Sequence, residues 1–137
     1  MAGAVFPWRD ANQFELLIDG PHFFARMIAA MADAPAHIDL ELYLVESGAC
    51  AEAIVAALEQ AATRGVRVRC LFDGYGSLAF TLGLRRRLID AGVELRFYNA
   101  ISCRKGLNNL YRDHRKLLLV YHRLPVLGGT GVPVEFL

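Results

Sequence analysis

The chain has 137 residues, a mass of 15.2 kDa and a mean hydropathy of +0.30, with 55% hydrophobic and 21% charged residues. This composition is too apolar for a disordered chain, and the length suits one domain that buries about two-thirds of its unfolded surface. No run of about 18 apolar residues occurs, so no membrane-spanning segment is expected in this chain. The first ten residues lack the basic region and apolar run of a signal peptide.

Charge is distributed unevenly along the chain. Residues 1–60 carry two Arg against nine acids, a net charge of −7, whereas residues 61–137 carry thirteen Lys or Arg against five acids, a net charge of +8. A basic second half suits an anionic ligand such as phosphate, nucleic acid or a lipid head group. The three cysteines are widely spaced and form no Cys-x-x-Cys pair, so we expect reduced thiols, no metal and no cofactor.

The first predicted elements are a strand and a helix. Residues 14–18 are predicted to form a short strand that Asp19 and Gly20 close. Pro21 suits the first turn of a helix, which we expect to end near Asp33 because its apolar residues recur at helical spacing.

A second strand and helix follow. Residues 38–45 alternate between apolar and other side chains, which predicts a strand with Glu41 and Tyr43 on one face. Either side chain could reach a functional site, although Tyr43 fits a packed core equally well. An Ala- and Leu-rich helix is predicted over residues 50–64, with Gly65 as its C-terminal cap.

The same alternation continues to residue 98. A strand over 66–72 ends in the turn 73–76, a helix runs to about residue 91 before Gly92, and a strand covers 93–98. Strands that alternate with helices predict an α/β domain with a mainly parallel sheet flanked by helices. The apolar composition favours strands that are buried on both faces of that sheet.

The last third of the chain is less regular. Residues 99–112 lack a sustained period and are predicted to be a loop at the carboxyl edge of the sheet, where active-site loops belong. A strand resumes over 115–120. Beyond it, Pro125 and Pro133 flank a Gly-rich stretch, so we expect this tail to be poorly formed or confined to a sheet edge.

His114 and Lys116 are the strongest candidates for chemistry. Two residues apart on a predicted strand, they would project from the same face. An imidazole can attack phosphorus or deliver a proton near neutral pH, while an ammonium group holds phosphate oxygens and offsets transition-state charge. A lone His-x-Lys is common by chance, so the neighbouring sequence decides whether it indicates a functional site.

Those surroundings resemble the HKD motif of the phospholipase D superfamily, in which His-x-Lys is followed at fixed distances by an Asp and by Gly-Gly or Gly-Ser. The matching residues here are His114, Lys116 and the pair Gly128-Gly129. Upstream segments 38–43, 64–77 and 88–98 also resemble the N-terminal half of bacterial cardiolipin synthases. The ordered combination is more specific than any single piece.

The resemblance implies one incomplete phospholipase D-like half spanning residues 1–137. In that family two HKD motifs face each other, one His forms a phosphohistidine, the other moves protons, and both Lys grip the phosphate. His114 would therefore be nucleophile or general acid, with Lys116 as phosphate clamp. The residues expected to bind phosphate or support the site are Arg115, Gly128, Gly129 and Glu41.

This sequence departs from the motif in its tail, from about residue 121. Tyr121 occupies the Asp position, His122 the Gly that often follows it, and Gly131 a position that is often Asn. Loss of the Asp is expected to loosen the orientation of the catalytic groups. Pro133 and Val134 also break the expected strand chemistry.

The leading functional interpretation is a phosphatidyltransferase of the cardiolipin synthase type, inactive as an isolated half. The resemblance implies phospholipid head groups like that of phosphatidylglycerol as partners, together with a second HKD half or a homodimer partner, and a peripheral location at the bacterial cytoplasmic membrane. A single-motif nuclease acting as a homodimer is the alternative, less favoured because few aromatic residues lie among the basic ones. A non-catalytic relic is the third class.

Overall fold

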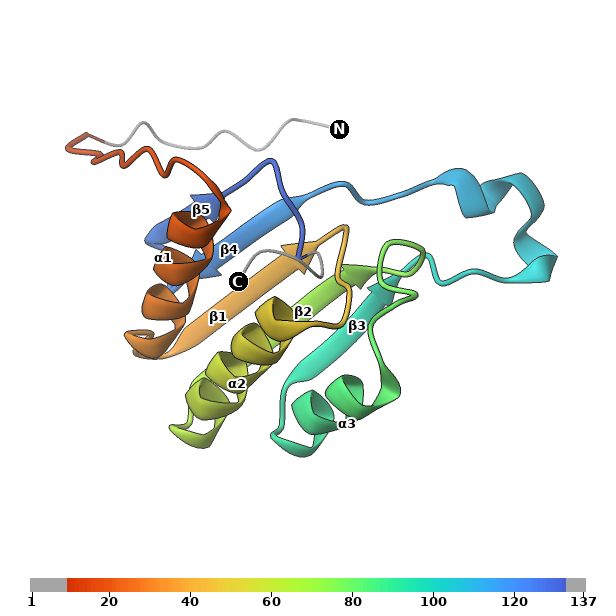
Figure 1. The fold of residues 1–137 in the computed structure, drawn as a ribbon, viewed down its shortest axis with the longest axis horizontal. Helices are drawn as coiled ribbons and strands as arrows, with labels where there is room; N and C mark the ends of the chain where they lie inside the picture. The colour runs from red at the N-terminus through yellow and green to blue at the C-terminus, as the bar shows by residue number, and fades with distance from the viewer. Residues whose placement is uncertain (1–9, 133–137) are drawn as a thin grey trace.

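A computed structural model describes residues 10–132 of the chain (Figure 1). Pro133 and Val134 lie outside the described residues. The elements, in chain order, are α1 (Gly20–Ala32), β1 (His37–Leu42), α2 (Ala49–Thr63), β2 (Arg67–Asp73), α3 (Leu82–Asp90), β3 (Glu94–Tyr98), the 3₁₀ helix η1 (Cys103–Leu110), β4 (Lys116–Val120) and β5 (Leu124–Leu127).

The five strands form one mixed sheet in the order β3-β2-β1-β4-β5. The first three are parallel, whereas β4 runs antiparallel to β1 and β5 antiparallel to β4. The predicted α/β class is confirmed, but the sheet is mixed rather than mainly parallel. The reason is that no crossover helix returns the chain after β3, so β4 enters at the edge where β1 to β3 end and must run in the opposite direction.

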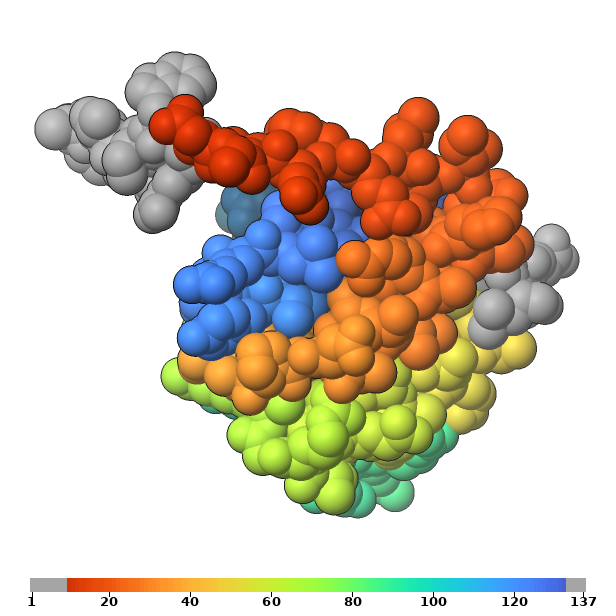
Figure 2. Space-filling model, turned by 90° about the vertical axis from the view of Figure 1, so that its left-hand side faces the viewer, coloured from red at the N-terminus to blue at the C-terminus, as the bar shows by residue number. Residues whose placement is uncertain are grey.

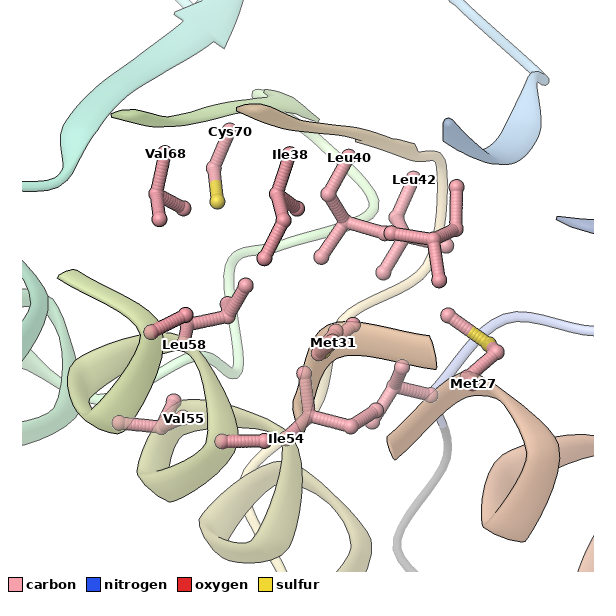
Figure 3. Packing of buried hydrophobic residues seen from close by; sticks show 14 of the residues in the cluster. Met27, Met31, Ile38, Leu40, Leu42, Ile54, Val55, Leu58, Val68 and Cys70 are labelled. Atoms are coloured by element: carbon pink, nitrogen blue, oxygen red, sulfur yellow. The ribbon is translucent and has the colours of Figure 1, made fainter. Parts of the chain in front are cut away.

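The three α-helices pack against the same face of the sheet (Figures 1 and 3). Alternate residues of the strands point into this layer and form the core with the helices. Figure 3 shows the contributing side chains, among them Met27, Met31, Ile38, Leu40, Leu42, Ile54, Leu58, Val68 and Cys70.

The opposite face of the sheet carries charged side chains that pair between strands. Arg69 donates to Asp39 at 2.5 Å, and Arg67 donates to Glu94 at 3.1 Å. The expectation that strands are buried on both faces is therefore wrong. Buried residues alternate with partly exposed ones along β1 and with exposed or partly exposed ones along β2 up to Phe72, which is the pattern of a sheet covered on one side.

The helix ends lie where the sequence predicts them. The Asp19 carboxylate accepts the His22 N–H at 3.1 Å, and Pro21 stands in the first turn of α1. Gly65 and Gly92 follow α2 and α3 with φ of +88°, a conformation that favours glycine at a helix C-terminus.

The strand predicted over residues 14–18 is wrong. This segment lies beside α1 and β5 but pairs with no strand among the described residues (Figures 1 and 2). Leu17 packs on the core, while Phe14 is 95% exposed and Leu16 87% exposed. The local sequence of residues 14–18 suits a strand, but a strand also needs a neighbouring strand to accept its backbone hydrogen bonds.

Residues 99–112 project from the carboxyl edge of the sheet as an extended arm, the cyan segment of Figure 1. The predicted loop is correct in position but contains η1, which kinks at Gly106 with φ of +47°. The arm leads directly into the segment that carries His114. Its placement therefore bears on the candidate site.

Candidate active site

The carboxyl end of β1 and the start of β4 meet at one edge of the sheet. Leu42 pairs with Lys116 across the two strands. Just beyond this pair, the Tyr43 N–H donates to the Arg115 carbonyl at 3.0 Å. This bond sets Tyr43 opposite the segment that carries His114.

His114 and Lys116 both lie against the ring of Tyr43. The His114 imidazole stacks on it with ring centroids 3.9 Å apart and an interplanar angle of 16°. The Lys116 Nζ lies over the same ring, 5.8 Å from its centroid, and donates to the His114 carbonyl at 3.1 Å. An exposed imidazole and a partly exposed ammonium therefore share one aromatic platform.

A buried carboxylate fixes the backbone just before His114. Asp73 is 1% exposed, and its side chain accepts the N–H groups of Tyr75, Gly76 and Asp113 at 2.8, 3.1 and 3.0 Å. The Arg112 guanidinium reaches the same carboxylate at 3.4 Å. The end of β2 and the approach to His114 are thus held by one side chain.

The charge state of Asp73 follows from this environment. Burial by itself raises the pKa of the carboxyl group, because a low-dielectric site disfavours charge. The N–H donors from Gly76, Asp113 and Tyr75, with the Arg112 guanidinium, outweigh burial and hold the pKa of Asp73 below its ordinary value. Asp73 is therefore an ionised anchor at neutral pH.

The glycines after Asp73 serve close packing. A Cβ on Gly76 would collide with the Tyr43 carbonyl, and the Gly76 carbonyl accepts the Val45 N–H at 3.1 Å. Gly74 N–H donates to the Tyr98 carbonyl at 2.8 Å. The sequence interpretation of this stretch as a strand-to-helix turn agrees with these contacts.

Arg115 and Glu41 lie together on the face of the sheet that the helices leave open. Arg115 donates to Glu41 at 3.1 Å, and its side chain also lies 3.7 Å from Asp113. Residue 41 alternates with the buried residues 40 and 42, so Glu41 points away from the helices. The structure joins these two predicted site residues to each other rather than to the His114 ring.

Gly128 and Gly129 return to the edge of the sheet beside β4. The Gly128 N–H donates to the Lys116 carbonyl at 3.2 Å, and a Cβ on Gly128 would lie 2.5 Å from the Phe23 ring. A Cβ added to Gly129 would meet no other heavy atom within 4 Å. A larger residue at position 128 would therefore force the Phe23 ring of α1 to shift, next to the strand that carries Lys116.

Tyr121 lies at the opposite end of β4 from His114. Its N–H donates to the His37 carbonyl at the start of β1, at 2.9 Å, and its ring stacks near His37. The expectation that this motif position supports the catalytic groups directly is wrong for this chain. The position belongs instead to the hairpin turn between β4 and β5.

Sequence reasoning missed Asp73, Arg112 and Asp113 as parts of the site. The available signal was an acidic residue at the carboxyl end of a buried strand, immediately before Gly74. No alternation or motif linked Asp73 to residues about forty positions later, because that contact depends on the path of the arm. Over residues 10–132 there is no helix long and apolar enough to cross a membrane.

The family model and the curated relatives point to the same family. The family model described as "Cardiolipin synthase, PLD-like domain" matches residues 27–132. Cardiolipin synthase B of Salmonella typhi is 35% identical over 130 residues, covering 93% of this chain and 32% of that protein. Cardiolipin synthase 1 of Bacillus cereus is 33% identical over 136 residues, covering 96% of this chain and 26% of that protein.

The chain thus spans about a third or less of the length of these curated relatives. A solved structure with a similar fold is a phospholipase D family member, Nuc, from Salmonella typhimurium, with a TM-score of 0.51 and 20% identity. The likeness covers 71% of this chain and 56% of Nuc, and it supports the fold alone. The family match and the curated relatives together show that the chain belongs to the phospholipase D-like domain family of the cardiolipin synthases.

Proposed function

We propose that this chain is the N-terminal half of a cardiolipin synthase-type phosphatidyltransferase, which acts through a phosphohistidine intermediate and needs a second HKD half for turnover. The observation that carries the proposal is the exposed His114 imidazole, stacked on Tyr43 beside the Lys116 ammonium. A reactive nitrogen and a fixed positive charge at one point suit attack on a phosphodiester.

The proposed reaction has two displacements at one phosphorus atom. In the first, one of the two histidines attacks the donor phosphate, the bond to the glycerol leaving group breaks, and the opposing histidine protonates the leaving oxygen. In the second, that histidine takes the proton of an acceptor hydroxyl, whose oxygen attacks phosphorus and breaks the nitrogen–phosphorus bond. His114 supplies either role, and Lys116 holds the non-bridging oxygens throughout.

The remaining predicted site residues fit supporting roles in this proposal. The Glu41–Arg115 ion pair of 3.1 Å braces β1 against the entry to β4, and Gly128 holds the Lys116 backbone close to α1. Gly129 leaves space for a ligand beside that strand. Direct phosphate contact from this half is assigned to Lys116.

The proposed partners follow from this chemistry. One is a phospholipid head group like that of phosphatidylglycerol, which would be both donor and acceptor. Another is the second HKD half, or a second copy of this chain, which would bring the opposing histidine. We place the assembly peripherally at the bacterial cytoplasmic membrane, where its substrates would be.

The test is phosphatidyl transfer by this chain co-expressed with the C-terminal half of a cardiolipin synthase. We expect cardiolipin to form from phosphatidylglycerol only when both halves are present, and not with His114→Ala. Transfer that survives His114→Ala would overturn the proposal. Cleavage of DNA by the chain alone, lost in His114→Ala, would favour the homodimeric nuclease instead.

A further inference from the structure

The arm over residues 99–112 exposes its apolar side chains. Leu107 is 82% exposed, Leu110 74%, Tyr111 68% and Ile101 48%. These four residues lie on the segment that projects farthest from the sheet (Figure 1). A cluster of large apolar side chains on a projecting segment is a feature of surfaces that contact another apolar phase.

Two asparagine side chains of the arm make hydrogen bonds within the arm. Asn99 donates to the carbonyls of Asn108 at 2.7 Å and Tyr111 at 2.9 Å. Asn109 donates to the Ser102 carbonyl at 2.9 Å and accepts the Ser102 N–H at 3.1 Å. The arm therefore holds its shape through inward amide bonds while its apolar residues face outward, the reverse of a surface adapted only to water.

The arm also carries positive charge without any acid. Arg104, Lys105 and Arg112 lie within residues 99–112, which contain no Asp or Glu. Arg104 and Lys105 are exposed on η1, between the apolar residues Ile101 and Leu107. Exposed apolar side chains flanked by cations match the apolar and anionic layers of a phospholipid interface.

Hydrogen bonds at the base of the arm join it to the candidate site. Arg112 at its base donates to the Asn99 carbonyl at 3.1 Å and contacts the Asp73 carboxylate, which also binds the Asp113 N–H. His114 follows immediately. An arm seated on a surface would therefore hold the His114 edge of the sheet toward that surface.

We propose that residues 99–112 dock the chain on an anionic phospholipid bilayer, with Leu107, Leu110 and Tyr111 entering the interface. The proposal deepens the proposed function and rests on it for the substrate that the bilayer would supply. A second copy of the chain is a weaker occupant, because symmetric pairing of two arms would bring like charges together.

Cys103 on the arm provides a direct probe. It is exposed, whereas Cys50 and Cys70 are buried, and burial raises the pKa of Cys50 to about 11 and of Cys70 to about 12. A thiol-directed, polarity-sensitive fluorophore should therefore label Cys103 selectively. We expect its emission to shift to the blue with vesicles of phosphatidylcholine and phosphatidylglycerol, and less so with phosphatidylcholine alone or at high salt.

Paired substitutions distinguish the arm from general hydrophobicity. Leu107→Asp with Leu110→Asp should weaken vesicle co-sedimentation at least about tenfold. Leu82→Asp with Ile89→Asp is the matched control, because these residues are 67% and 57% exposed but lie on α3. Arg104→Gln should weaken binding to phosphatidylglycerol vesicles about fivefold, and Arg86→Gln on α3 should not.

The outcomes separate the arm from the chemistry. His114→Ala should bind vesicles like the wild type, so arm-dependent binding without phosphatidyl transfer would retain the arm and reject the function. If the assembly transferred phosphatidyl groups between soluble short-chain phospholipids, but the arm substitutions left vesicle binding unchanged, the docking role of the arm would be rejected and the proposed function would stand. The proposal would be overturned if Leu107→Asp/Leu110→Asp bound vesicles as well as the wild type does. It would also be overturned if the wild type bound no vesicles but self-associated, and the double substitution abolished that self-association.

Discussion

The imidazole of His114 lies nearly parallel to the phenol ring of Tyr43, with ring centroids 3.9 Å apart. Tyr43 comes from just beyond β1 and His114 from just before β4, so neither is oriented by strand geometry alone. The stack joins two segments that are far apart in the sequence. It fixes the ring plane of the proposed reactive group while leaving that group exposed.

The first prediction tests this stack. Tyr43→Leu should shift the imidazole proton resonances of His114 downfield, because the ring current of the phenol is lost, whereas Tyr43→Phe should preserve them. An aromatic pair contributes about 0.5–1.5 kcal/mol, so the Leu variant should also be less stable by about that amount. Nuclear magnetic resonance of ring-labelled histidine is the measurement, with His22 as the internal reference because it lies outside the site. Unchanged His114 resonances in Tyr43→Leu would show that the rings do not stack in solution.

The second prediction concerns the Asp73 anchor. Asp73→Asn keeps the side-chain volume but replaces one acceptor oxygen with a donor that faces N–H groups. Because hydrogen bonds to a charged group are worth about 1.5–3 kcal/mol, we expect the free energy of unfolding to fall by at least that amount. Denaturant unfolding measures it, with Asp90→Asn, an exposed residue at the end of α3, as control. Equal stability of the two variants would remove Asp73 as an anchor.

The third prediction follows from the lowered pKa of Asp73. A carboxyl group whose pKa is lower in the folded state adds stability above its unfolded pKa, near 3.8, and loses that contribution as the pH falls through the folded pKa. The stability difference between wild type and Asp73→Asn should therefore be constant near neutral pH and shrink below about pH 4. Unfolding curves over that pH range measure this. A difference that grew toward acid pH would contradict the assigned sign.

The order of strands and helices was predictable from the sequence because it follows from local periodicity and from glycine and proline signals. Gly65 and Gly92 end helices for a conformational reason that acts within a few residues. The position of residues 14–18 was not predictable in this way, since a strand requires a partner that local alternation cannot name.

The reactive residues of the candidate site were predictable from the sequence, but the residues that hold them in place were not. His114 and Lys116 were found from their spacing and from the family motif. Tyr43 and Asp73 contribute through contacts with His114 and Asp113, which depend on how the sheet and arm meet. The motif itself misled at Tyr121, because a motif gives the order of residues along the chain and not which edge of the sheet each one reaches.

The fourth prediction concerns the hairpin between β4 and β5. The Arg123 N–H donates to the Val120 carbonyl at 3.1 Å, and the two central residues, Tyr121 and His122, have φ of +49° and +54°. Two positive φ values are the pattern of a type I′ turn, for which Asp-Gly is a preferred sequence. His122→Gly should therefore be more stable than His122→Ala by about 1 kcal/mol, because both lose the imidazole but only Gly adopts positive φ freely. Thermal unfolding of the pair is the measurement, and an Ala variant at least as stable as the Gly variant would show that the turn carries no such strain.

The last prediction concerns Lys116 in the assembly of this chain with a C-terminal half. Its ammonium lies over Tyr43 and would hold the phosphate oxygens on which charge develops, so Lys116→Gln should lower kcat by about 10²–10³. Lys116→Arg keeps the charge and should lose less, while Arg86→Gln on the outer part of α3 should leave kcat unchanged.

Tyr121→Asp should neither raise the rate of the assembly nor activate the chain alone. Tyr121 lies at the far end of β4, and general acid–base catalysis by the missing histidine is worth about 10² to 10⁴ in rate. Initial rates of cardiolipin formation distinguish these variants. If Tyr121→Asp activated the isolated chain, one half would be sufficient for turnover. Residue 121 would then affect the reaction from the end of β4 that lies farthest from His114.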